Sequence, residues 1–354
     1  EMKQLTAIFL VLIMALLMFG CSSLEEKPEP PDTSTPEVTP KPTEPTFAYN
    51  PLTGLNTLAA DRDKKRPYAV SINNIDKSWP QYGISKADIV YEIETEGGIT
   101  RILALFSDVR GIDQLGSVRS LRHQFVQAAY QLDPIIVHIG TSDYTEDCIQ
   151  SRGIKTMNGF LTNDFLFIDA ERMKHYGSEH CKFTSGELLD KGDKFFDMRT
   201  TSESALKSAF NFAPEGSPVT LSGGDATRVK YLFSRYYDGD FTYNTTTQKY
   251  YKSQHGLPQL DAGNGDVQLS YDNLFVLYAG IHGLYGELVD VDFSSGGTGY
   301  YFSRGRYEEI TWVKDSYSAD FVFTKTDKTT LLVNPGTTHV GIISSSLSGS
   351  TEIS

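Results

Sequence analysis

The chain has 354 residues, of which 39% are hydrophobic and 12% aromatic, and its formal net charge is −13. A negative excess of this size argues against nucleic acid or an anionic bilayer as the ligand of the whole surface, although a local basic site is still allowed. The high aromatic content excludes a disordered chain and favours a folded body rich in strands.

The start of the chain has the pattern of a bacterial lipoprotein signal peptide. Lys3 supplies a positive charge, residues 7–19 form an apolar run, and Gly20 is the small residue before Cys21. In such signals the cysteine thiol is lipidated and becomes the mature N-terminus. We therefore predict a signal peptide over residues 1–21 and lipid anchoring to the extracytoplasmic face of the bacterial cell membrane. The alternative is a transmembrane anchor, but a spanning helix needs about 20 apolar residues, more than this run provides.

The composition then changes to a run rich in proline, threonine and glutamate, over residues 22–48. Repeated proline favours extended polyproline II and removes backbone donors, so this run cannot bury a core. We predict a semi-rigid stalk that holds a folded body away from the membrane.

The folded body begins with strands. Residues 67–73 and 87–94 alternate apolar and polar side chains, and residues 100–106 are mostly apolar, so each range predicts a strand. Gly97 and Gly98 separate the second and third of these strands. Glycine supplies the backbone angles of a tight hairpin turn there.

Helices and a further strand follow. Apolar residues spaced as on one helix face predict a helix over residues 117–132, and the apolar run 134–140 predicts a strand. Serine or threonine followed by acidic residues marks helix starts at Ser142, Thr184 and Thr200. The first half of the body therefore mixes strands and helices.

The second half consists of short strand-like segments separated by Gly, Asn and Asp turns, which predicts a mostly antiparallel β domain. A hairpin tip is expected at residues 302–307. The predicted strands are 228–233, 241–244, 249–252, 273–278, 287–293, 300–302, 307–313 and 330–333.

The length of the body suits two domains, because an ordinary domain has roughly 100–200 residues. We place the boundary next to Pro214, in a stretch that also contains glycine. The predicted organisation is an N-terminal α+β domain over residues 49–213, a C-terminal β-rich domain over residues 214–346, and a tail over residues 347–354.

Two cysteines remain once Cys21 is acylated, namely Cys148 and Cys181. An exported protein permits a disulfide between them, and two free thiols are the other possibility. His180 next to Cys181 lacks the spacing of a metal site. We expect no metal here.

Several stretches together resemble the YerB-like lipoproteins, also called the DUF3048 family, which have an N-terminal and a C-terminal family domain. The resemblance covers nearly all of the body and implies an α+β sandwich-like fold and an envelope lipoprotein, with no established reaction. Two positions depart from the family pattern, Ser117 where proline is more frequent and His339 where tryptophan is common. The resembling stretches are 50–54, 66–70, 79–92, 96–101, 116–122, 299–302, 310–314 and 334–338.

One set of polar residues predicts a binding site. Arg119 and Arg122 are three apart, so on a helix they would share a face near its N-terminus, which favours anions. If the neighbouring strand ends converge, guanidinium groups there could hold a carboxylate, a phosphate or an acidic glycan. The candidate residues are Glu96, Arg101, Arg119, Arg122, His138, Arg172 and His180.

Two other interpretations of these residues stay open. In the first, Arg101 and Arg119 form internal ion pairs with Glu92, Glu94 or Glu96, and His138 is a hydrogen-bonded core histidine. In the second, His138 or His180 is a general base with Glu96 as its partner. The sequence has no recognisable nucleophile motif to support such catalysis.

Two further patterns do not carry chemistry. The glycine-rich run 296–299 joins strands and does not open a helix, so it lacks the amide cradle of a phosphate loop. The acidic and amide residues between 261 and 272 miss the spacing of a calcium loop. We expect a lipoprotein without cofactor that binds an envelope polymer or anionic ligand through its first domain. The alternatives are an envelope hydrolase or transferase and a protein-interaction module, and no nucleic acid partner is expected.

Overall fold

The computed structural model describes residues 47–354, which form one compact unit. The predicted signal peptide, the lipidated Cys21 and most of the predicted stalk lie outside the described residues. Within the described range, no helix combines the length and the apolar character needed to cross a membrane.

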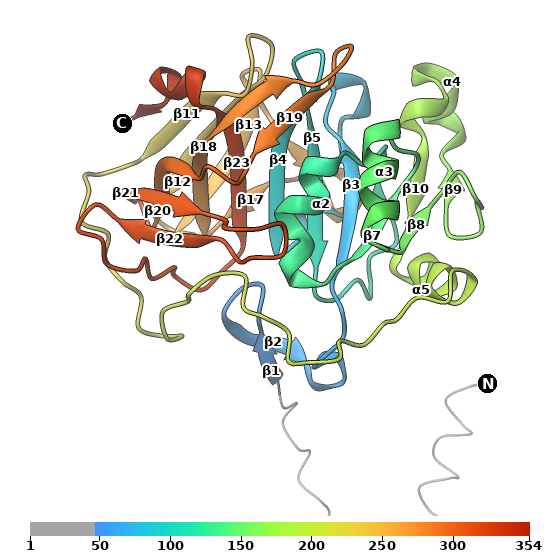
Figure 1. Cartoon of the computed structure of the whole chain (residues 1–354), viewed down its shortest axis with the longest axis horizontal. Coiled ribbons are helices and arrows are strands. Elements are labelled where there is room, and N and C mark those ends of the chain that lie inside the picture. Colours follow the sequence, from blue (N-terminus) through green and yellow to red (C-terminus); the bar gives the residue numbers. More distant parts are fainter. Residues whose placement is uncertain (1–46) are drawn as a thin grey trace, which may run out of the picture. The chain divides into compact units, whose positions relative to one another are not determined.

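The framework is an 11-stranded mixed sheet with the order β22-β21-β20-β18-β23-β4-β5-β3-β7-β8, and β19 pairs with β18 beside it (Figure 1). Its strands are β3 (Tyr68–Asn73), β4 (Ile89–Glu96), β5 (Ile99–Phe106), β7 (Ile135–His138), β8 (Thr156–Asn158), β18 (Asn273–Gly283), β19 (Val289–Asp292), β20 (Gly297–Ser303), β21 (Arg306–Val313), β22 (Val322–Lys325) and β23 (Thr338–Ser344).

Strand β23, close to the C-terminal end of the described chain, joins the two halves of this sheet. It pairs in parallel with β18 on one side and with β4 on the other. Strands from before and after residue 213 thus belong to one continuous sheet. The division into two domains at that residue stays a prediction about the organisation of the sequence.

A second sheet of six strands has the order β14-β13-β12-β11-β24, with β17 paired to β13. Its strands are β11 (Arg228–Leu232), β12 (Asp238–Asn244), β13 (Lys249–Gln254), β14 (Leu257–Pro258), β17 (Ser270–Tyr271) and β24 (Glu352–Ile353). Three small sheets contain β1 (Phe47–Asn50) with β2 (Leu55–Ala59), β6 (Leu115–Gly116) with β10 (Lys182–Thr184) and β9 (Phe167–Ile168), and β15 (Leu260–Asp261) with β16 (Val267–Gln268).

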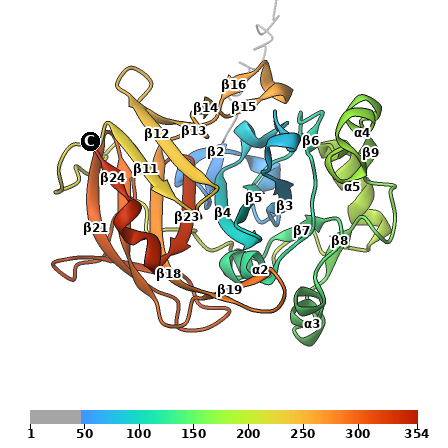
Figure 2. The same ribbon diagram turned by 90° about the horizontal axis from the view of Figure 1, so that it is seen from above.

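Four α-helices and several 3-10 turns complete the described fold. The helices are α2 (His123–Ala129), α3 (Asp143–Ser151), α4 (Ala170–Tyr176) and α5 (Gly186–Phe195). The 3-10 turns are η1 (Ala60–Arg62), η2 (Asp76–Ser78), η3 (Ile84–Lys86), η4 (Tyr130–Leu132), η5 (Ser178–His180), η6 (Ala262–Asn264) and η7 (Ser345–Ser350). Viewed from above, α2 lies on one side of the large sheet and β11 to β13 lie on the other (Figure 2).

Each face of the large sheet buries its own core, because side chains alternate along a strand. On β4, Ile89, Tyr91 and Ile93 belong to the core that includes Phe125 of α2. Val90, which points the other way, belongs to the core shared with the second sheet. The result is a mostly β architecture in which the large sheet is covered on both faces.

The structure confirms the four strands predicted in the first half, the hairpin at Gly97 and Gly98, and the antiparallel hairpins of the second half. It also confirms the helix start at Ser142, whose side chain accepts from Thr145 N. The helix predicted from Thr184 begins one residue later, with Ser185 as its N-cap.

Two predicted elements are absent from the described structure. The structure has no helix after Thr200 in the described chain, where residues 199–227 form turns and isolated bridges. Residues 330–333 form no strand. Helix α4, capped by Asp169, was not predicted. Cys148 and Cys181 are both free thiols, so the disulfide alternative is excluded.

Candidate functional site

The predicted helix over residues 117–132 was wrong in its first turns, and this changes the setting of Arg119 and Arg122. Helix α2 begins only at His123, and Arg122 before it has an extended backbone with φ −124° and ψ 148°. The two arginines therefore do not share a helix face, and the expected contribution of a helix dipole is not available to them.

The extended conformation has a clear cause in backbone pairing. Arg119 N donates to Ser71 O at 2.8 Å, and its carbonyl accepts from Ile139 N at 3.1 Å. Leu121 N then donates to Gly140 O at 3.0 Å. The segment is held between β3 and the chain just after β7, and these bonds replace those that a helix would make.

Glu96 is the centre of the site, because it binds two arginines at once. Its Oε1 accepts from Arg101 Nη2 at 2.7 Å and from Arg122 Nη2 at 3.0 Å, and its Oε2 accepts from Arg122 Nε at 2.9 Å. The pairing of β4 with β5 shifts register between Glu94 and Glu96, and such a bulge re-aims a side chain. We call Arg101, Arg119 and Arg122 with Glu96 the arginine cluster.

The charges of this cluster are largely withdrawn from water. Arg101 is fully buried, and its Nη1 donates to Ser120 O at 2.8 Å while its Nε has no partner among the described residues. Burial and the charges of Arg122 and Arg119 lower the pKa of Arg101 to about 10, against the opposing effect of Glu96. Burial raises the pKa of Glu96, but Arg101 and Arg122 outweigh it, and the net shift is downward.

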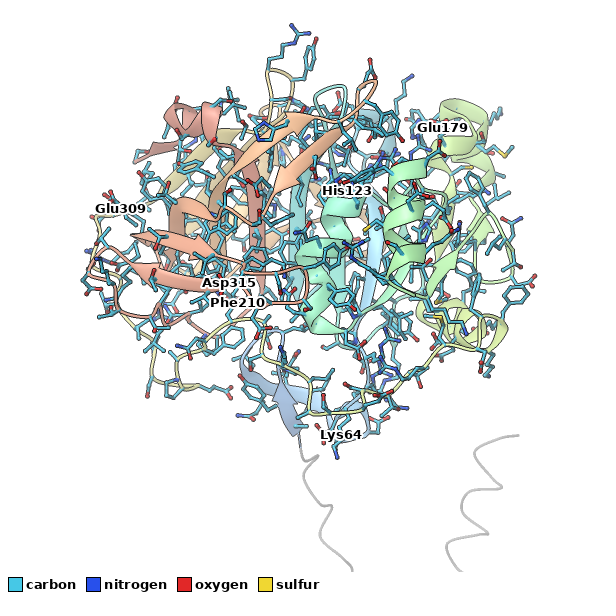
Figure 3. All side chains as sticks on the ribbon, viewed as in Figure 1. Lys64, His123, Glu179, Phe210, Glu309 and Asp315 are labelled. Atoms are coloured by element: carbon cyan, nitrogen blue, oxygen red, sulfur yellow. The ribbon has the colours of Figure 1, made fainter. Side chains whose placement is uncertain are left out.

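Arg119 differs from the other two arginines because its partner is exposed. Its Nη2 donates to Glu179 Oε2 at 2.7 Å, and the side chains are 26% and 63% exposed, respectively. Glu179 lies toward the outer edge of the molecule, near α4, in Figure 3. An exposed ion pair of this kind contributes about 0–1 kcal/mol, so a competing anion can replace Glu179 at low cost.

An exposed aromatic ring lies close to the backbone that carries these arginines. Phe160 is 74% exposed, and its ring covers Gly140, whose φ is +75°. A Cβ at Gly140 would lie 2.3 Å from the ring, so only glycine permits this approach. Gly140 O accepts from Leu121 N, so one backbone hydrogen bond links the residue under the ring to the segment between Arg119 and Arg122.

The remaining candidates have structural partners. Both nitrogens of His138 are engaged, Nδ1 with Gly140 O and Nε2 with Thr156 Oγ1, each at 2.9 Å. Asn73 Nδ2 lies 2.9 Å from His180 Nδ1. Among the described residues, neither imidazole hydrogen bonds to Glu96. This geometry matches the core-histidine interpretation of His138 and gives no support to a His–Glu catalytic pair.

Arg172 is also held by the protein itself. Its guanidinium donates to the carbonyls of His180, Pro80 and Lys77 at 3.2, 3.1 and 3.4 Å, and its side chain is buried. These bonds tie α4 to the loop before β4. A ligand role for Arg172, like that of the other candidates, stays a prediction.

The free energy of unfolding should decrease as the pH decreases, because His138 is more easily protonated in the unfolded state than in the folded state. Burial lowers the pKa of His138 to about 4 from its usual 6.5. The unfolded state therefore takes up a proton below pH 6.5 that the folded state refuses until about pH 4, so this contribution is present above pH 6.5 and is lost as the pH falls. We expect a loss of about 3 kcal/mol between pH 7 and pH 4.

The measurement is urea unfolding across this pH range for the native chain and for His138→Gln. The pKa of His180 is also lowered, mainly by burial, so the difference between the two proteins isolates His138. An equally steep loss of stability in His138→Gln would contradict the assignment.

A neighbouring cavity of about 540 Å³ lies between α2, α3 and β19. On its wall, His123 Nε2 lies 2.8 Å from Asp290 Oδ1, and Figure 3 shows His123 on α2. Cys148 Sγ in the same cavity lies 3.1 Å from Tyr317 Oη. No hydrogen bond joins His123 to Cys148 in the described structure, so the cavity has a His–Asp pair and a thiol without an assembled nucleophile and base.

Sequence reasoning missed a buried polar network between the two sheets. Glu92 Oε2 lies 3.1 Å from Lys252 Nζ and 3.1 Å from His339 Nε2, and all three side chains are fully buried. Glu92 Oε1 accepts from Asn74 Nδ2 and Thr100 Oγ1, both at 2.8 Å. The network connects β4 and β23 of the large sheet to β13 of the second sheet.

The charges in this network decide its protonation. Burial raises the pKa of Glu92, but Lys252 and the bond from His339 outweigh it and bring the pKa to about 2. Burial lowers the pKa of His339, so the imidazole is neutral and donates from Nε2. One signal was present in the sequence. Lys252 is two residues from Tyr250 on β13, and side chains two residues apart point to the same face of a strand. A strand that buries Tyr250 therefore also buries Lys252.

Comparisons with known proteins agree with the resemblance described above. The family model described as "Protein of unknown function (DUF3048) N-terminal domain" matches residues 52–198, and the corresponding C-terminal model matches residues 227–340. A Bacillus subtilis (strain 168) protein named "Putative lipoprotein YerB" is 30% identical over 272 residues, which is 74% of this chain and 77% of the relative.

A solved structure is also similar. The crystal structure of the YerB protein from Bacillus subtilis matches with a TM-score of 0.75 and 27% identity, over 87% of this chain and 99% of that one. The fold described here is therefore shared with that protein.

Proposed function

The chain belongs to the DUF3048 family, and from this premise we propose that it is a lipid-anchored extracytoplasmic protein that binds anionic groups of an envelope polymer through the arginine cluster. The relative is named as a lipoprotein, which supports association with a membrane. The sequence pattern at Cys21 and the proline-rich run after it support an anchor and a spacer on the outer side.

The observation that carries the proposal is the charge imbalance of the cluster. Arg101 and Arg122 share the single carboxylate of Glu96, and Arg119 has only the exposed Glu179. Arg119 has no hydrogen bond from Nε or Nη1 to any described residue, so the guanidinium keeps donors for a ligand. A bidentate contact to a carboxylate or a phosphate pairs Nη2 with Nε or with Nη1, so such a ligand would share or replace the bond of Nη2 to Glu179.

The exposed ring of Phe160 supports a polymer over a free ion. Glycan and peptide units present flat or apolar faces, which an exposed aromatic ring beside a charged group can contact. An isolated inorganic anion would gain nothing from this ring. The cluster and Phe160 together fit a chain that carries a carboxylate or phosphate next to an apolar or sugar face.

Removing the side chain of Arg119 should weaken binding to cell wall, and removing that of Glu179 should strengthen it. Arg119→Ala removes the exposed guanidinium, and we expect binding at least about tenfold weaker, since hydrogen bonds to charged groups contribute about 1.5–3 kcal/mol. Glu179→Ala removes the competing carboxylate, and we expect binding up to about fivefold tighter. The measurement is co-sedimentation of the full chain, purified in detergent, with purified cell wall.

The matched control is Arg110→Ala, because Arg110 is another exposed arginine paired to carboxylates, Asp108 and Asp61. It should bind as the native chain does. Equal binding by Arg119→Ala and the native chain would refute the proposal, and equal loss in Arg110→Ala would show that only overall charge matters.

A further inference from the structure

A second cavity, of about 610 Å³, has an excess of basic side chains. It lies where η4, the chain after α3 and the segment around residues 197–199 meet. Two carboxylates, Asp133 and Asp197, also line it. The basic side chains in its lining are Arg66, Arg152, Lys155, Arg199 and Lys207. We call this set of residues the basic cavity.

One part of the basic cavity is rigid. Arg66 donates to the carbonyls of Asp133, Pro134 and Arg199 at 2.8, 2.8 and 2.7 Å, and its side chain is only 10% exposed. The carboxylate of Asp133 lies 3.1 Å from Arg66 Nε and 2.7 Å from Arg199 Nη2. One negative charge thus faces two guanidinium groups.

The other three cations, Arg152, Lys155 and Lys207, are exposed, so a ligand can reach them. Arg152 lies 4.0 Å over the ring of Tyr317 and forms no ion pair with a carboxylate of residues 47–354. Lys155 is 54% exposed; its Nζ donates to the backbone carbonyl of Asp197 at 2.6 Å and lies 3.8 Å from the exposed carboxylate of the same residue. Lys207 is 56% exposed and lies 3.2 Å from Asp320, which is itself half-exposed. Each of these contacts exchanges readily with solvent ions.

A buried amine behind the wall adds to the positive potential. Lys314 is buried, and its Nζ donates to Gln131 Oε1 at 3.1 Å and to Ala319 O. Gln131 lines the basic cavity. Burial, with a smaller contribution from the charge of Lys207, lowers the pKa of Lys314 to about 8 against the opposing effect of Asp320. Cations held together in this way are favourable only with a compensating anion.

We propose that the basic cavity is a second ligand site, separate from the arginine cluster, which binds a segment carrying several closely spaced oxyanions. The volume falls in the range of about 300–1,000 Å³ typical of organic ligands and exceeds what one phosphate needs. The excess of basic over acidic side chains calls for more than one negative charge. Phosphate and carboxylate chains share this chemistry.

The test is calorimetric titration of the full chain in detergent with inorganic tripolyphosphate, with citrate, and with inorganic phosphate. We expect tripolyphosphate or citrate to bind more tightly than inorganic phosphate, and the order of the first two identifies the source of the oxyanions. In Lys155→Ala/Lys207→Ala the affinity for the tighter probe should fall at least tenfold, and raised salt should weaken binding to the native chain.

Two controls make the result specific. Lys174→Ala/Lys191→Ala removes the same charge from α4 and α5, and should leave the affinity unchanged. Arg119→Ala should also leave it unchanged, which separates this site from the arginine cluster. Arg152→Gln, which keeps a polar side chain, should weaken binding severalfold and serves if the double lysine variant fails to fold.

Any one of three results would overturn the proposal. The first is that inorganic phosphate binds as tightly as the multivalent probes. The second is that the two double lysine variants lose affinity equally. The third is that Arg119→Ala abolishes binding while Lys155→Ala/Lys207→Ala and Arg152→Gln do not, which would assign the anion to the arginine cluster.

Discussion

Replacing Glu92 with alanine should lower the free energy of unfolding by about 3–5 kcal/mol. The substitution leaves the ammonium of Lys252 fully buried without a carboxylate beside it. In the native chain Lys252 Nζ lies 3.1 Å from Glu92 Oε2. It also removes the acceptor of the bond from His339. Urea unfolding at pH 7 measures this effect, and the midpoint should fall with little change in slope.

Two further variants separate loss of the charge pair from loss of the side chain. Glu94→Ala, on the same strand, removes a half-buried carboxylate with no ion pair in the described structure and should cost about 1 kcal/mol or less. Glu92→Gln/Lys252→Met removes both charges and should recover much of the stability lost in Glu92→Ala. A double variant as unstable as Glu92→Ala would mean that the polar network, and not the unpaired charge, sets the cost.

The second large effect is expected for Arg101→Met. Methionine keeps much of the volume but removes the bonds to Glu96 Oε1 and Ser120 O, which lie at 2.7 and 2.8 Å. We expect a loss of about 3 kcal/mol in stability, because both bonds are charge-assisted and buried. Since the Ser120 carbonyl lies between Arg119 and Arg122, binding to cell wall should also fall.

Arg119→Met is the matched control for stability. Its partner Glu179 is 63% exposed, so this variant should stay within about 1 kcal/mol of the native chain while still losing wall binding. The two variants therefore separate an arginine that supports the site from one that contacts the ligand. A loss of stability as large for Arg119→Met as for Arg101→Met would contradict this division.

Much of the fold could be predicted from local pattern. Residues 68–73, 89–96 and 99–106 carry strand propensity, alternation and a glycine turn that all indicate the same hairpin and its neighbour. Ser142 and its acidic followers specify a helix start without any tertiary contact. In these elements local and global preferences agree.

Where the prediction failed, long-range contacts override the local pattern. The apolar spacing from Leu121 onward is that of a helix, yet the residues before His123 pair with β3 and with the chain after β7. The capping pattern at Thr200 exists, but that segment bonds instead to residues 64–66. No window of local sequence contains these partners.

The candidate site was predicted in part. Glu96 and Arg101 flank the Gly97–Gly98 turn, so the sequence could predict that they lie close together. Arg122 joins them in the structure because the segment before α2 is extended. The network of Glu92, Lys252 and His339 could not be assembled in the same way, because its members lie on three strands and Glu92 is 247 residues from His339.

The position of β23 has a consequence for how the molecule is made. This strand fills the gap between β18 and β4, so until residues 338–344 have left the ribosome, β4 is an unprotected edge strand with its backbone donors and acceptors exposed. Contacts of such high sequence separation form late and slowly. The growing chain must therefore keep an incomplete sheet from self-association until residues 338–344 are made, so the large sheet can close only after all its other strands have been synthesised.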